Sequence, residues 1–199
     1  MKKAFLTLLL IASAIFAKAQ DKQRSDTLNI DLDKDLKKDF VIFDRDNAVI
    51  IVKLSTQKFK PIKSTQLEFD PFSAGIRPKR EGFEFANNWM RAGYAFQFRY
   101  NPNQKKIQLI GMSRYEFGPA NNDGSGESSI NLLTNSYIGN WNYWDLNKDE
   151  LIKIPAIKQK MIFPVTYFSN FDDGIFNQYQ DKCVALYEKA KAKMMNKKN

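Results

Sequence analysis

Four closely spaced aspartates are the residues of this chain whose type and spacing most clearly allow chemistry. Asp31, Asp33, Asp35 and Asp39 occupy positions one, three, five and nine of the segment DLDKDLKKDFVI, residues 31–42. Carboxylates at these positions of a tight loop converge on one point, which is how oxygen-rich calcium loops gather hard ligands at about 2.4 Å. The sequence therefore predicts a metal site with these four ligands and calcium as its cofactor.

Other residues of the same segment favour a solvated acidic turn without an ion. Position six of calcium loops is glycine, but here it is Leu36, which disfavours a positive φ by roughly 1 kcal/mol or more. Position twelve is Ile42 rather than the glutamate of an EF-hand, so a helix–loop–helix site is excluded. Three lysines lie close enough in sequence to neutralise the carboxylates: Lys34, Lys37 and Lys38.

The acidic segment leads directly into an expected strand, Phe40 to Phe43. In this arrangement it resembles the calcium-loop-plus-strand unit of FG-GAP or VCBS-like repeats, found in integrin-type propellers and many secreted bacterial proteins. A propeller needs several four-stranded blades, so one such loop implies a single-unit or degenerate relative. A second patch repeats only the first three spacings: Asp145, Asn147 and Asp149. Its ninth position is Lys153, and we expect a plain turn there.

Four further segments carry a second resemblance: DPFSAGI (70–76), MRAGYAFQFRY (90–100), NDGSGESSINLLT (122–134) and YIGNW (137–141). They resemble a group of uncharacterised secreted proteins of the Bacteroidetes. The similarity spans most of the chain after its first residues. It implies a location in the cell envelope and no particular activity.

The first nineteen residues have the pattern of a cleavable signal peptide. Lys2 and Lys3 precede an apolar run from Ala4 to Phe16, and Ala17 and Ala19 give the small-x-small pattern at the cut. The apolar run is shorter than the roughly 20 residues that cross a membrane. We therefore expect cleavage before Gln20 and a mature protein in the periplasm or secreted.

The mature chain is expected to form one domain that is mainly β, an antiparallel meander or small sandwich, with a C-terminal packing helix. Residues 20–27 read as a disordered polar linker and residues 28–195 as the domain. Tyr94 to Tyr100 alternate apolar and polar side chains, as half-buried strands do. Apolar residues recur every three or four positions between Asp173 and Lys193, which predicts a helix with Cys183 on its buried face.

The composition excludes several classes of enzyme. The chain has no histidine, so Ser-His-Asp and Cys-His nucleophiles and histidine-bound zinc are excluded. Gly124 and Gly126 lie in a segment without the Gly-Lys-Ser/Thr ending of a phosphate loop. The formal net charge of +9 falls to +6 when the three lysines of the signal peptide are removed. No nucleic-acid-binding motif accompanies it, so we expect no nucleic-acid partner.

Two kinds of surface group remain as functional candidates. Carboxylate-pair glycoside hydrolysis needs no histidine, and five acids are available for it: Asp70, Glu81, Glu84, Glu116 and Glu127. Tyr143 and Trp144, beside Asp145 in an expected loop, are predicted to form an exposed aromatic binding surface, whereas Trp141 is assigned to the core.

These observations favour a non-enzymatic binding protein of the envelope, with a protein or glycan as its partner. Two alternatives stay open: a carboxylate-based glycan hydrolase, and an envelope inhibitor or immunity protein. A cleft with two facing acids would favour the hydrolase, and an aromatic, basic face would favour binding.

Overall fold

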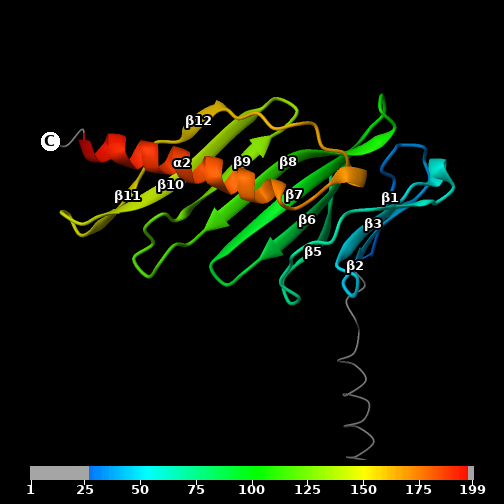
Figure 1. The fold of residues 1–199 in the computed structure, drawn as a ribbon, viewed down its shortest axis with the longest axis horizontal. Coiled ribbons are helices and arrows are strands. Elements are labelled where there is room, and N and C mark those ends of the chain that lie inside the picture. Colours follow the sequence, from blue (N-terminus) through cyan, green and yellow to red (C-terminus); the bar gives the residue numbers. More distant parts are fainter. Residues whose placement is uncertain (1–26, 197–199) are drawn as a thin grey trace, which may run out of the picture.

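A computed structural model describes residues 27–196, which form two antiparallel sheets and one long C-terminal helix (Figure 1). The smaller sheet has the order β1-β2-β3-β4. Its strands are β1 (Thr27–Ile30), β2 (Asp39–Asp44), β3 (Val49–Lys53) and β4 (Pro61–Lys63). The short 3-10 helix η1 (Ser55–Gln57) follows β3. The predicted signal peptide and most of the predicted linker lie outside the described residues, but Thr27 belongs to β1 rather than to the linker.

The larger sheet is a meander whose neighbours in sequence are neighbours in space, in the order β11-β10-β9-β8-β7-β6-β5, with β12 also pairing β10. The strands are β5 (Gly75–Lys79), β6 (Gly82–Asn88), β7 (Ala92–Asn101), β8 (Lys106–Glu116), β9 (Gly126–Asn131), β10 (Ser136–Asp145), β11 (Glu150–Lys153) and β12 (Ile157–Lys160). A bulge interrupts the pairing of β7 and β8 beside Gln97. The predicted mainly β architecture is confirmed.

Alternation of side chains gives the large sheet one apolar and one polar face. On β7, Tyr94, Phe96 and Phe98 are buried, while Gln97 and Arg99 on the other face are only half-buried. This is the period-two pattern expected from the sequence, because successive side chains of a strand point to opposite faces. The predicted strand and its hairpin partner β8 are therefore confirmed.

The helix α2 (Ile175–Asn196) runs across the apolar face of the large sheet (Figure 1). Its buried residues are Ile175, Tyr179 and Cys183, so the predicted helix and the buried position of the only cysteine are confirmed. The 3-10 helix η2 (Phe168–Asn170) precedes it and places Phe168 in edge contact with Phe98. No helix within residues 27–196 has the length and apolar character needed to cross a membrane.

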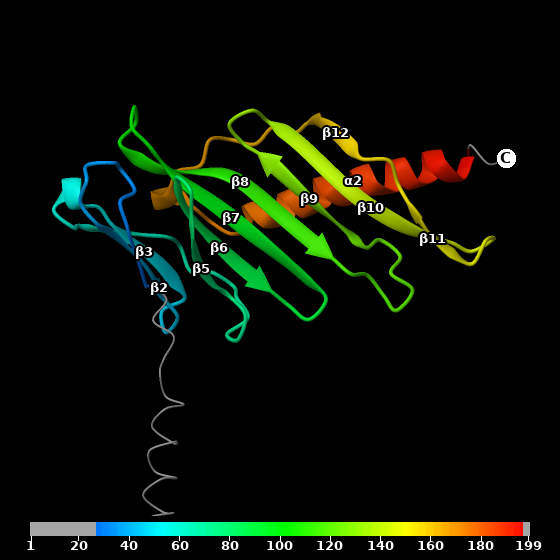
Figure 2. The ribbon, with the colours of Figure 1, turned by 180° about the vertical axis from the view of Figure 1, so that it is seen from behind.

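The small sheet packs on the same core as α2. Phe43 of β2 makes edge contacts with Phe85 of β6 and with Phe69. A single cluster of buried apolar residues includes both sheets and the helix. In Figure 2, which views the molecule from behind, no helix of residues 27–196 crosses the other, polar face of the large sheet.

Candidate functional site

The acidic segment forms the connection between β1 and β2. Asp31 follows the last residue of β1, Asp33 lies in the loop, and Asp39 is the first residue of β2. The β1–β2 pairing aligns Ile30 with Asp39, so the hairpin brings the two ends of the loop together. Antiparallel pairing, and not proximity in sequence alone, therefore brings Asp39 back to Asp31.

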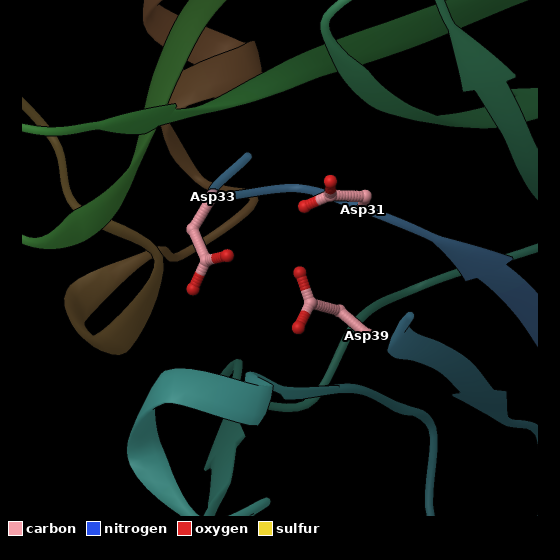
Figure 3. Close-up of side chains that lie close together, drawn as sticks. All are labelled: Asp31, Asp33 and Asp39. Carbon is pink, nitrogen blue, oxygen red and sulfur yellow. The ribbon is translucent and has the colours of Figure 1, made fainter. Parts of the chain in front are cut away.

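Three of the four predicted ligands converge. One carboxylate oxygen each from Asp31, Asp33 and Asp39 lies within 4.8 Å of the others, and Figure 3 shows the three carboxylates directed toward a common space. Asp35 is not part of this group. It accepts hydrogen bonds from the Ser55 hydroxyl at 2.6 Å and from the backbone N–H of Lys37 at 2.8 Å.

Asp39 is the structural centre of the group. It is 0% exposed, and its two oxygens accept hydrogen bonds from the backbone N–H groups of Leu32 at 2.8 Å and Ser55 at 2.7 Å. These bonds join the loop to η1. Because buried donors need partners, Asp39 holds the loop in place as well as contributing a carboxylate.

Two carboxylate oxygens in the loop have no hydrogen-bond partner within residues 27–196. Asp31 Oδ1 and Asp33 Oδ1 are both buried and unpaired. The other oxygen of each carboxylate is bonded: Asp31 Oδ2 accepts from the backbone N–H of Leu36 at 3.0 Å, and Asp33 Oδ2 accepts from the Thr56 hydroxyl. A buried acceptor without a partner costs about 1–3 kcal/mol, more when it is charged.

No lysine or arginine of the described chain forms an ion pair with Asp31, Asp33 or Asp39. Lys34 instead pairs with Glu81, its Nζ 3.9 Å from Oε1, while Lys37 and Lys38 are exposed. Burial raises the pKa of Asp33, and the negative charges of Asp39 and Asp35 add to this against the hydrogen bond from Thr56. The three lysines of the loop therefore do not neutralise these three carboxylates.

The loop adopts the left-handed turn even though it has no glycine. Lys34 has φ 63° and Leu36 has φ 68°. A non-glycine residue in this region costs about 1–2 kcal/mol. The Leu36 N–H bond to Asp31 stabilises the turn, and Leu36 is 94% exposed, so its side chain meets no neighbour that would oppose this geometry.

Sequence reasoning missed the two η1 side chains that enclose the acids, Ser55 and Thr56. They are 20 and 23 residues away from Asp35 and Asp33, respectively. The signal that would have found them is register. Phe40 pairs with Lys53 across the β2–β3 hairpin, so the residues after β3 must lie beside the start of β2.

The predicted aromatic surface is wrong for Tyr143. β10 extends to Asp145, and alternation along it turns Tyr137, Trp141 and Tyr143 toward the core. Tyr143 is 1% exposed. Trp141 is buried as predicted. Trp144, on the other face of the strand, is half-buried and stays a candidate for surface contact.

Trp144 is tied to the helix through Asp123. The Asp123 carboxylate accepts a hydrogen bond from the backbone N–H of Trp144 at 2.7 Å, and Lys191 Nζ of α2 donates to it at 3.1 Å. Burial of Asp123 acts to raise its pKa, but these two bonds, the charge of Lys191 and a bond from the Tyr187 hydroxyl outweigh it, and the pKa lies below its usual value. Three parts of the fold therefore meet at this carboxylate: the loop that precedes β9, the strand β10 and the helix α2.

Replacing Asp123 with asparagine is expected to destabilise the protein at neutral pH by less than about 1 kcal/mol, because the group is partly exposed. A lowered folded-state pKa stabilises the fold above the unfolded value of 3.8 and loses this effect as the pH falls through the folded pKa. Thermal melts of both proteins from pH 7 to pH 2.5 should show the difference shrinking below about pH 4. A difference independent of pH would contradict this role.

Four of the five candidate acids are bonded within the fold, and the fifth, Glu127, is exposed on β9. Glu81 accepts a hydrogen bond from Arg99 at 2.9 Å, which lowers the pKa of Glu81, with Lys34 adding to the effect. Glu84 pairs with Lys79 at 2.9 Å, and Glu116 pairs with Arg114. Asp70 accepts backbone N–H bonds in its own turn. A general acid needs a raised pKa, so Glu81 is poorly suited to that role.

The second acidic patch is the turn between β10 and β11. Asn147 N–H donates to Asp145 Oδ1 at 3.1 Å. Within residues 27–196, only Asp31, Asp33 and Asp39 bring three potential metal-binding side chains together. The patch is therefore a turn, as expected.

No protein-family model, curated protein or solved structure matches this chain. The resemblances of residues 31–42 and of the central segments stay predictions.

Proposed function

We propose that this chain is an exported, non-enzymatic binding protein of the cell envelope and that its β1–β2 loop binds a calcium ion. The observation that carries the calcium site is the pair of buried, unpaired oxygens, Asp31 Oδ1 and Asp33 Oδ1. Together with Asp39 they place three negative charges in a small space without a protein cation. A divalent ion would supply both the missing charge and the missing partners.

Calcium suits this loop better than magnesium or zinc. The side chains at the centre offer only carboxylate oxygens, which are hard ligands, and the chain has no histidine for zinc. Calcium accepts six to eight oxygens in flexible geometry, whereas magnesium requires a near-ideal octahedron. An irregular loop with three side-chain carboxylates leaves positions for water, as weak extracellular calcium sites do, with dissociation constants of about 0.1–1 mM.

Calcium at ten times its dissociation constant is expected to stabilise the protein by about 1.4 kcal/mol, because it binds only the folded state. This corresponds to a rise of roughly 3–6 °C in melting temperature for a chain of this size. Asp33→Ala should abolish the rise. Asp35→Ala is the matched control from the same loop, and it should keep most of the rise because Asp35 lies outside the group of three.

Melting curves should be recorded in 5 mM calcium, 5 mM magnesium and a chelator for all three proteins. In the chelator, Asp33→Ala should be little less stable than the original, since loss of the Thr56 bond is offset by relief of charge repulsion. Equal calcium shifts in the original protein and Asp33→Ala would refute the site. A shift given only by magnesium would refute calcium as the ion.

The binding assignment rests on the arrangement of charge. The acids Glu81, Glu84 and Glu116 are each neutralised by a basic neighbour. Cys183 is fully buried, and burial raises the pKa of its thiol. These groups are therefore held in unreactive states. Incubation of the protein with envelope glycans should release no new reducing ends.

A further inference from the structure

The polar face of the large sheet contains, beside the acidic loop, a hollow with two adjacent parts. Its first part, of about 400 Å³, lies between the loop and the ends of β7 and β8 and includes Asp33 and Gln108. Its second part, of about 340 Å³, lies over the middle of β7, β8 and β9. Both parts are lined by Arg99, Ile110 and Leu133, so they lie side by side along the face of the sheet.

Small side chains account for the depth of the second part. Ala95 on β7 pairs with Ser113 on β8, which pairs with Ser129 on β9. Next to this row, Gln97 pairs with Gly111 beside the bulge. Longer side chains in these positions would fill the space. Each part reaches the volume of ordinary small-ligand sites, about 300–1,000 Å³.

The hollow presents unused hydrogen-bonding groups from its walls. Gln108 is only 9% exposed, and its Oε1 accepts a hydrogen bond from Asn101 at 2.7 Å. The Nε2 donors of Gln108 have no partner within residues 27–196, and neither do the side chains of Gln97, Ser113 and Ser129. Gln108 lines the first part of the hollow and the other three residues line the second part, so these groups are available to a ligand.

The lining chemistry excludes most other ligands. The backbone of the central strands is already paired on both sides, so a peptide cannot bind here as an added strand. Charges in the first part balance, since its lining has two cations, Lys34 and Arg99, and two carboxylates, Asp33 and Glu81. The hollow therefore offers no excess positive charge for a phosphate or nucleic acid, and too few apolar groups for a lipid.

We infer that the hollow binds a neutral carbohydrate chain. A carbohydrate is elongated and carries a hydroxyl group, both donor and acceptor, on almost every carbon. The amide groups of Gln97 and Gln108 and the hydroxyls of Ser113 and Ser129 can donate and accept in the same way. The inference rests on the proposed binding function and names its ligand class.

The calcium loop forms one wall of this hollow. Asp33 and Lys34 of the loop line it together with Tyr100 of β7. The two sites are therefore adjacent. An ion that orders the loop also orders this wall, so carbohydrate affinity is expected to fall when calcium is chelated.

Affinity gel electrophoresis of the purified protein tests the inference, with three neutral polysaccharides as probes: a β-glucan, a mannan and a xylan. At least one should retard the protein in 5 mM calcium. Ser129→Trp places a large ring in the hollow at an exposed strand position, and it should weaken that binding at least tenfold. Glu150→Trp, at an exposed position of β11 outside the hollow, is the matched control and should bind normally.

Gln97→Ala gives a second variant that removes polar atoms without adding bulk, and it should weaken binding several-fold. Absence of retardation by all three probes would overturn the inference, as would retardation unchanged in both Ser129→Trp and Gln97→Ala. A calcium-dependent rise in melting temperature would still support the calcium loop in either case. Release of sugars from a bound probe would leave the carbohydrate site standing and refute the non-enzymatic function.

Discussion

Replacing Phe98 with alanine is expected to lower the free energy of unfolding by about 3–5 kcal/mol, the range for deleting a buried phenylalanine. Phe98 is fully buried in the centre of β7. It stacks on Phe83 of β6, with ring centroids 5.1 Å apart, and makes edge contacts with Phe168 and Phe171. Its loss therefore opens a cavity where the large sheet meets the segment leading into α2.

Chemical denaturation measures this effect, and the melting temperature should fall by roughly 10 °C or more. Phe72→Ala is the matched control, because Phe72 is 86% exposed and the same atoms are removed without a cavity. It should change stability by less than about 0.5 kcal/mol. A loss below about 1 kcal/mol in Phe98→Ala would show that the packing around η2 is not formed as described.

Asp39→Ala is expected to have the second largest effect, a loss of about 2 kcal/mol or more. The substitution leaves the buried N–H groups of Leu32 and Ser55 without their acceptor. Each unpaired buried donor costs about 1–3 kcal/mol, and the relief of repulsion from Asp31 and Asp33 offsets only part of this. The loop should lose its attachment to η1.

The measurement is made in a chelator, so that loss of a bound ion does not contribute. Asp35→Ala serves again as the control, since Asp35 accepts its bonds near the surface, and it should lose less than about 1 kcal/mol. Equal losses of stability in the two variants would mean that Asp39 contributes no more to the fold than Asp35 does. Hydrogen exchange at Leu32 and Ser55 should also accelerate in Asp39→Ala alone.

The parts of the fold that could be predicted from the sequence are those with a strong local period. The alternation from Tyr94 to Tyr100 and the three-to-four spacing before Lys193 each identify one element, because the buried face of each depends on residues close in sequence. No strand is predicted from the sequence over β10, and at its end Tyr143, Trp144 and Asp145 look like loop residues. Its continuation is decided by pairing with β11, which joins Tyr143 to Ile152.

The acidic site shows the same limit. Spacing alone grouped four aspartates, and the structure brings together three of them. Asp35 is removed from the group by Ser55, which comes from a different hairpin. The carbohydrate hollow had no local signal, since Gln97, Gln108 and Ser129 come from three strands and meet only through the register of the sheet.

The order of elements along the chain has a consequence for how the protein folds. The strands from β5 to β10 are joined by short connections, the longest being residues 117–125. Pairing neighbours of this kind requires only small loops to close and is fast. The helix that covers their apolar face is made after all of these strands. A chain that emerges from its N-terminus can therefore form a sheet whose aromatic face is open to other chains until Ile175 and the residues after it arrive. Aggregation competes with folding while this face is open. In a chain that is cut before α2, the face would stay open.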